Sequence, residues 1–146
     1  LAKAAEIGVT ADFARLHLAA FTDALADPEI RAALSRTAHG RSAGADVSLW
    51  RERRFAVHID GVHLSGAFDR VVIERQGGEP VAAEIIDFKT DVIGDDDALQ
   101  SAVAHYAPQM FAYRDALCSL THLDPSAVRL TLLFLDPHRA ATVDGP

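Results

Sequence analysis

The chain has 146 residues, of which 49% are hydrophobic and 24% charged, a composition typical of a single globular domain with one core. Its 21 acidic and 14 basic residues give a formal net charge of −7, which argues against tight binding to nucleic acid by this chain alone. There is no apolar run of about eighteen residues, no charged-then-apolar leader and only one cysteine, Cys118. We therefore expect no membrane span, a cytoplasmic location, no intrachain disulfide and no four-cysteine iron–sulfur cluster.

The first 46 residues are predicted to be mainly helical. Apolar residues recur at helical spacing over residues 11–25, and Asp27-Pro28-Glu29 is a typical start for a second, short helix that ends near Ser35. Residues 39–46 are small, polar and glycine-containing, which predicts a loop. This helical part leads into a core over residues 49–136, and both belong to one predicted domain, residues 1–146.

Three antiparallel strands are predicted next, over residues 49–59, 62–74 and 82–88. Asp60-Gly61 is a strong tight-turn signal between the first two strands. Gln76-Gly77-Gly78 indicates a turn between the second and the third. The pattern predicts a three-stranded meander.

Two acidic residues, Asp69 and Asp87, lie on the second and third of these strands. If the turn between them centres on Gly78, they face each other with Cβ atoms roughly 5 Å apart. Carboxylates placed that way repel each other unless a cation or a shared proton lies between them. Oxygen ligands at this separation suit Mg²⁺ or Mn²⁺, so we predict a divalent-metal site.

Lys89 lies two residues after Asp87 and therefore points to the same face of the strand. A lysine beside a bound metal ion can orient the attacking hydroxide or stabilise charge on a phosphate, so phosphodiester hydrolysis is the reaction that these groups suit. The alternative is that Asp87 and Lys89 form a surface ion pair and that Asp69 is an ordinary hairpin charge.

A helix over about residues 106–120 follows, with the acid run 95–97 as a solvated cap before it. Pro108 is tolerated near a helix start, and Tyr106, Gln109 and Tyr113 share one helical face. The alternative is that both tyrosines are half-buried packing residues and Gln109 a solvated neighbour. An apolar run over residues 128–135 predicts a buried strand. The order α-β-β-β-α-β predicts an α/β fold, a mixed sheet flanked by helices.

These motifs resemble the PD-(D/E)XK nucleases, and within them the RecB/AddA-like exonuclease domains of UvrD-type helicases. Gly66-Ala67-Phe68-Asp69 resembles the family's G-x-x-D element, and Asp87-Phe88-Lys89-Thr90 its D-Y/F-K-T element. Gln109 and Tyr113 match its Q-x-x-x-Y helix, and residues 50–55 resemble an R-E-x-x-F strand. The resemblance implies the restriction-endonuclease-like core.

The same resemblance implies roles for single residues. Asp69 and Asp87 would bind Mg²⁺ or Mn²⁺, with the Phe88 backbone carbonyl as a further ligand. Lys89 would act at the attacking water, and Gln109 and Tyr113 would brace the site or contact DNA. For Glu52 we favour an ion pair with an arginine over a role at the metal.

One departure from the family concerns a metal-binding histidine. Helicase-linked members carry it in an upstream G-x-x-x-H helix that this chain lacks, and His17 is a poor substitute because it lies among leucines and alanines. We therefore expect a fragment of a longer helicase–nuclease chain with weak activity of its own. No G-x-x-x-x-G-K-[ST] loop occurs, so ATP would be used only in the helicase part outside this sequence.

The predicted function is that of a metal-dependent DNA exonuclease module in double-strand-break repair, whose partners are DNA, the helicase domains of the same chain and a partner subunit. Arginines near the sheet edge predict either a phosphate rail or a solvated face: Arg51, Arg53, Arg54, Arg70 and Arg75. One alternative is a catalytically inactive, nuclease-like structural or DNA-guiding module. Another is a self-contained endonuclease, which predicts a strongly basic face that the sequence lacks.

Overall fold

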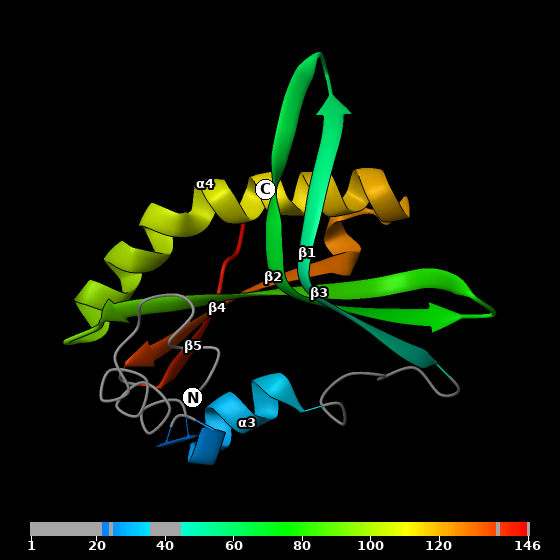
Figure 1. The fold of residues 1–146 in the computed structure, drawn as a ribbon. Coiled ribbons are helices and arrows are strands. Elements are labelled where there is room, and N and C mark those ends of the chain that lie inside the picture. Colours follow the sequence, from blue (N-terminus) through cyan, green and yellow to red (C-terminus); the bar gives the residue numbers. More distant parts are fainter. Residues whose placement is uncertain (1–21, 24, 36–44, 137, 146) are drawn as a thin grey trace, which may run out of the picture.

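The computed structural model describes residues 22–23, 25–35, 45–136 and 138–145. The described elements form a mixed five-stranded sheet in the order β1-β2-β3-β4-β5. Helix α4 crosses one face of the sheet, and α3 lies on the opposite side (Figure 1). Their bounds in chain order are α3 Pro28–Leu34, β1 Asp46–Ile59, β2 Val62–Gln76, β3 Glu79–Val92, α4 Asp96–Thr121, η2 Pro125–Ala127, β4 Val128–Asp136 and β5 Arg139–Thr142.

Strands β1, β2 and β3 form the predicted antiparallel meander. The β1–β2 turn has Asp60 and Gly61 at φ 49° and 80°, and the β2–β3 turn has Gly77 and Gly78 at φ 58° and 91°. Positive φ at both central residues is the geometry of the tight hairpin turn whose twist matches that of the strands. The predicted turn positions are therefore correct.

The register of β2 against β3 changes near this second turn. Gln76 pairs with Glu79 at the turn, whereas Glu74 pairs with Ala82, so that Val81 is one extra residue in β3. From there the ladder continues to the pair Arg70↔Ile86. The next residues in this register are Asp69 and Asp87.

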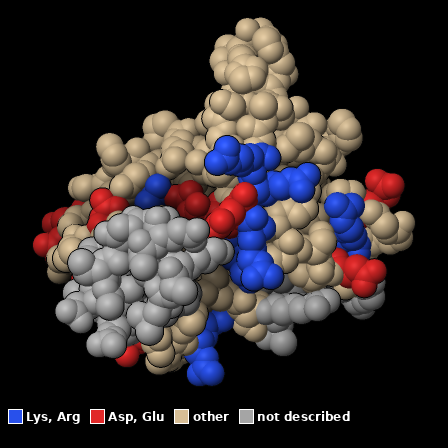
Figure 2. Space-filling model, in the orientation of Figure 1, with Lys and Arg blue, Asp and Glu red and all other residues tan. Residues whose placement is uncertain are grey.

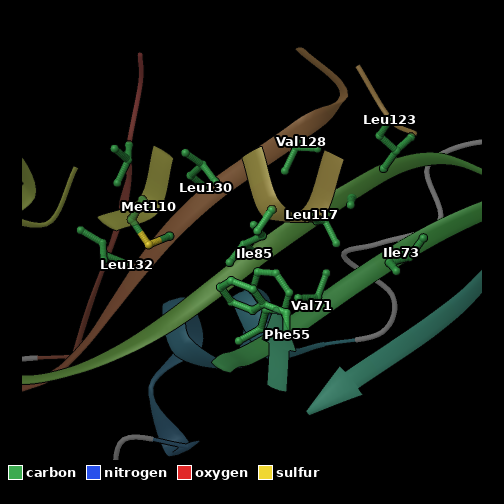
Figure 3. Close-up of a cluster of buried hydrophobic side chains, with 14 of the residues drawn as sticks. Phe55, Val71, Ile73, Ile85, Met110, Leu117, Leu123, Val128, Leu130 and Leu132 are labelled. Carbon is green, nitrogen blue, oxygen red and sulfur yellow. The ribbon is translucent and has the colours of Figure 1, made fainter. Parts of the chain in front are cut away.

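The core lies between the sheet and α4. Strand β3 pairs with β4 in parallel, and α4 is the crossover that a parallel pair needs. Side chains from both layers interdigitate there, including Val71, Ile85, Met110 and Leu132, each fully buried (Figure 3). A smaller cluster of Ile30, Ile86 and Leu133 fixes α3 against the other face. Strand β4 is thus covered on both sides, which explains its continuous apolar sequence.

Helix α4 begins ten residues earlier than the sequence pattern predicts. Asp95 is its N-cap, and its side chain accepts a hydrogen bond from the Ala98 N–H at 2.8 Å. Pro108 therefore lies inside the helix, where it removes one backbone hydrogen bond. The expected start near Tyr106 was wrong because packing of both halves of the helix on the sheet outweighs this local cost.

The short helix expected after Asp27 is α3, and the Ile30 N–H donates to Asp27 Oδ1 at 3.2 Å. Most of residues 11–25 and residues 39–44 of the predicted loop lie outside the described residues. The loop was predicted to include Asp46, but this residue begins β1. Strand β5, which pairs antiparallel with β4, was not predicted. None of the described helices is long and apolar enough to cross a membrane.

Candidate functional site

The site lies where β2 separates from β3. The backbone ladder between them ends at Arg70↔Ile86. Beyond it the Asp69 side chain replaces a backbone partner, because Asp69 Oδ2 accepts a hydrogen bond from the Phe88 N–H at 3.0 Å. In a strand, the N–H and C=O of one residue point toward the same neighbour. The Phe88 carbonyl therefore also points toward the opening beside Asp69.

A bend in β1 and β2 produces this separation. Arg51 pairs with Arg70 and Arg53 with Phe68, so Glu52 stands opposite Asp69 outside the regular ladder, with φ 46°. A positive φ in a strand interior is uncommon for a residue other than glycine, and it re-aims the strand at that point. In Figure 1 both strands turn away from β3 at this level. Glu52 is exposed, and no ion pair with an arginine of the described residues is formed, contrary to expectation.

Asp87 is buried at the opening, with only 4% of its surface exposed. Its Oδ2 lies 2.7 Å from Lys89 Nζ, a close ion pair, and no other described group donates a hydrogen bond to this oxygen. Burial raises the pKa of Asp87, and the nearby Asp69 carboxylate acts in the same direction, while the Lys89 ammonium opposes them. A carboxylate at this opening supplies the oxygen ligand type that divalent cations prefer.

Lys89 is fixed by α4 as well as by Asp87. Its Nζ donates to Gln109 Oε1 at 2.9 Å, and Gln109 Nε2 donates in turn to the Tyr113 hydroxyl at 3.2 Å. The structure therefore brings Asp69, Asp87, Lys89, Gln109 and Tyr113 together. The alternative of a solvated surface pair does not describe Asp87 and Lys89, whose side chains are 6% and 12% exposed.

The sequence motifs did not predict the participation of Asp91, and they treated Tyr106 only as a helix-face residue. Lys89 Nζ lies 3.8 Å from the centre of the Tyr106 ring, a cation–π contact. The Tyr106 hydroxyl donates to Asp91 Oδ2 at 2.9 Å, a bond that raises the pKa of Tyr106, with a smaller effect of burial. Strand alternation is the signal that could have found Asp91, because residues 87, 89 and 91 share one face.

Gly66, the first residue of G-x-x-D, is explained by aromatic packing. The Phe55 and Phe68 rings stack at 4.5 Å, and both contact the Tyr113 ring edge-on at 5.7 and 5.5 Å. A Cβ on Gly66 would lie 2.9 Å from Phe55 Cζ and 3.5 Å from Tyr113 Cε1. The absence of a side chain thus lets the distal part of the β1–β2 hairpin close on α4 and hold Tyr113.

The donor set fits a divalent cation in part. Asp69, Asp87 and the Phe88 carbonyl supply oxygen atoms, the ligand type that Mg²⁺ and Mn²⁺ prefer. Among the described residues no group of three or more His, Cys, Asp or Glu side chains could hold a metal ion. His17 lies outside these residues. Glu84 Oε1 accepts a hydrogen bond from the Thr131 hydroxyl at 2.6 Å. Glu84 was expected to point to the opposite face of the sheet from Asp87, because it lies three residues earlier in the strand.

The arginines do not form one continuous rail. Arg70 donates to the Leu34 carbonyl at 3.1 Å, and Arg75 donates to the Gly78 carbonyl at 2.9 Å, at the far end of the hairpin. Arg51, Arg53 and Arg54 remain exposed on β1 beside the bend. Figure 2 shows basic side chains gathered over this part of the molecule, next to acidic ones. A pocket lined by Ala82, Arg114 and Ser126, among others, contains none of the motif residues.

Comparison with known protein families gives a match over nearly the whole chain. The PD-(D/E)XK nuclease superfamily matches residues 3–145, which include all of the motifs described above. No curated protein matches the chain.

Proposed function

Because this chain belongs to the PD-(D/E)XK nuclease superfamily, we propose that it hydrolyses DNA phosphodiester bonds with Mg²⁺ or Mn²⁺ at Asp69, Asp87 and Lys89. The mixed sheet with its flanking helices is the restriction-endonuclease-like fold of that superfamily. The observation that carries the proposal is the convergence of two carboxylates and a half-buried ammonium where β2 leaves β3.

Asp69, Asp87 and the Phe88 carbonyl are the groups that would hold the metal ion. When bound, such an ion acidifies a water molecule and offsets charge on the phosphate. The Phe88 N–H holds Asp69 in one orientation, and burial of Asp87 keeps competing water away from its Oδ2. Because of the bend at Glu52, these oxygen atoms face an opening between β2 and β3 where the backbone hydrogen-bond ladder is interrupted.

Lys89 would orient the attacking water and stabilise the negative charge that grows on the phosphate as the new P–O bond forms and the old one breaks. Each of its contacts favours a fixed ammonium: a carboxylate at 2.7 Å, an amide oxygen at 2.9 Å and an aromatic face at 3.8 Å. Gln109 and Tyr113 would position Lys89 from α4. The hydrogen bond from Gln109 Nε2 to the Tyr113 hydroxyl turns the Gln109 side chain so that its Oε1 faces the ammonium. Such preorganisation reduces the rearrangement needed during reaction.

The finer proposal is an exonuclease module of a RecB/AddA-type helicase–nuclease that processes double-strand breaks. It is supported by the motif order and by the net charge of −7, which suits a domain to which a helicase and a partner subunit deliver DNA. On this proposal these 146 residues alone are weakly active, because no G-x-x-x-H motif among them supplies the metal-binding histidine of the family. An inactive, DNA-guiding module is disfavoured by the retained contacts of Lys89 with Asp87 and Gln109.

The test is digestion of linear and circular duplex DNA by the full natural protein in the presence of Mg²⁺. Asp87→Ala and Lys89→Ala should each abolish digestion and leave the fold and any ATPase activity unchanged. Asp97→Ala, which changes an exposed acid at the start of α4, is the matched control and should digest like the wild type. Degradation of linear but not circular DNA supports the exonuclease, and undiminished digestion by Asp87→Ala contradicts the assignment of the site.

A further inference from the structure

Beyond the bend, residues 53–68 of β1 and β2 form a two-stranded arm that projects from the sheet (Figure 1). Its inner face packs toward α4 through Phe55, Val57 and Phe68, all buried. Its outer face consists of three cross-strand pairs whose six side chains are all exposed: Arg54↔Ala67, Ala56↔Ser65 and His58↔His63. Among the described residues nothing covers this outer face.

The chemistry of the outer face differs from that of the chain as a whole. None of its six residues is acidic in a chain with a net charge of −7, and the acid within residues 53–68, Asp60, lies in the turn at the tip. In Figure 2 the visible side of the arm carries no acidic atoms, and basic side chains gather at its base. There the exposed Arg51, Arg53 and Arg54 lie beside the site.

Two of the pairs, Arg54↔Ala67 and Ala56↔Ser65, contain only small side chains besides the arginine. Small side chains allow a phosphate backbone to approach the ribbon closely. The six residues 54–59 extend roughly 20 Å at about 3.3 Å per residue, which is more than half a turn of duplex DNA. A two-stranded ribbon also fits the major groove, which is about 12 Å wide.

We propose that the outer face of the arm is a binding surface for double-stranded DNA, which it holds beside Asp69, Asp87 and Lys89. This inference rests on the proposed nuclease function and names its substrate class. Single strands are bound chiefly by stacking of bases on aromatic rings. The outer face has no Phe, Tyr or Trp, and its two imidazole rings, His58 and His63, meet edge to face at 6.3 Å and so do not form a flat stacking platform. The arm therefore prefers a duplex, whose phosphates it contacts along the outer face from Arg54 to the pair His58↔His63.

The experiment measures binding of a fluorescent duplex and of the same single strand by anisotropy, with the full protein and without divalent metal so that no cutting occurs. The double variant Ala56→Asp/Ser65→Asp places two carboxylates on the outer face. Its matched control, Ser101→Asp/Ala104→Asp, makes the same two changes at exposed positions of α4. A parallel assay follows Mg²⁺-dependent hydrolysis of bis(p-nitrophenyl) phosphate, which is too small to reach the arm.

The expected result is about a tenfold loss of duplex affinity in the arm variant, a much smaller loss for the single strand and unchanged hydrolysis of the small phosphodiester. Arg54→Ala should also reduce the slope of log affinity against log salt by about 1. Unchanged duplex affinity, or equal losses for duplex and single strand, would overturn the inference. If the wild type hydrolyses no phosphodiester, the proposed function fails, and the binding comparison still decides the role of the arm.

Discussion

Replacement of Gly66 by alanine tests how the G-x-x-D element supports the site. The new Cβ would lie 2.9 and 3.1 Å from two atoms of the Phe55 ring. This ring cannot move freely, because it stacks on Phe68 at 4.5 Å and meets Tyr113 on another side. Overpacking of this kind costs about 1–3 kcal/mol. At about 2–4 °C per kcal/mol, the melting temperature should fall by roughly 2–12 °C.

The same substitution should lower activity at temperatures where the protein stays folded. Displacement of the Tyr113 ring would disturb its hydrogen bond with Gln109, and through it the position of Lys89 Nζ. Thermal unfolding by circular dichroism and the initial rate of DNA hydrolysis are the two assays. Gly94→Ala is the matched control, because nothing lies within 4 Å of the added Cβ and its φ is not in the left-handed region. If Gly66→Ala is as stable and as active as Gly94→Ala, the explanation of the motif is wrong.

Three further predictions concern the site. Tyr106→Leu removes the ring beside Lys89 Nζ and should lower kcat about 2- to 30-fold, equivalent to 0.5–2 kcal/mol, while Tyr106→Phe keeps most of the rate; equal losses would show that the bond to Asp91 matters instead. Burial raises the pKa of Asp87, so the folded protein keeps the proton of this carboxyl at pH values where the unfolded chain has lost it. The free energy of unfolding of the wild type, measured relative to that of Asp87→Asn, should therefore fall as the pH rises above about 3.9. Denaturant titrations at several pH values check this, and a relative stability that rises with pH refutes it. Mn²⁺ at a hundredfold excess over its Kd should stabilise the wild type by about 2.7 kcal/mol and leave Asp69→Asn unaffected, which thermal shifts measure.

The meander and its turns were predictable because their signals are local. Asp60-Gly61 and Gly77-Gly78 can adopt positive φ, and the flanking apolar runs are long enough for strands. The register was also predicted, but for an incomplete reason. The two-residue turn alone would place Asp69 opposite Ile86, and the extra residue Val81 shifts the pairing by one so that Asp87 takes that place. No local signal in the sequence reveals this bulge.

The features that sequence reasoning missed depend on tertiary packing. The first half of α4 and the interior position of Pro108 follow from burial against the sheet, which helical periodicity around Tyr106 does not report. The roles of Asp91 and Tyr106 depend on how β3 and α4 face each other, over a separation of 15 residues. Strand β5 has only four residues and forms on the edge that β4 offers. Local sequence patterns therefore predict the helices and strands, whereas the arrangement of the site also depends on contacts between the sheet and α4.

The bend at Glu52 illustrates the same limit. Residues 46–59 have the composition of one uninterrupted strand, and nothing in them marks a residue with φ 46°. The bend becomes intelligible only with Asp69 on the neighbouring strand, since it frees that carboxylate from a regular ladder and turns the arm outward.

The central claim, that these acids hold a metal ion at which DNA is cut, is tested most directly by the rate of hydrolysis of linear duplex DNA as Mg²⁺ is titrated into the wild type and into Asp69→Asn/Asp87→Asn. We predict a saturable rise of the rate for the wild type, its complete reversal by a chelator, and no rise for the double variant. Hydrolysis that proceeds without a divalent cation, or that persists at the wild-type rate in the double variant, would contradict the claim.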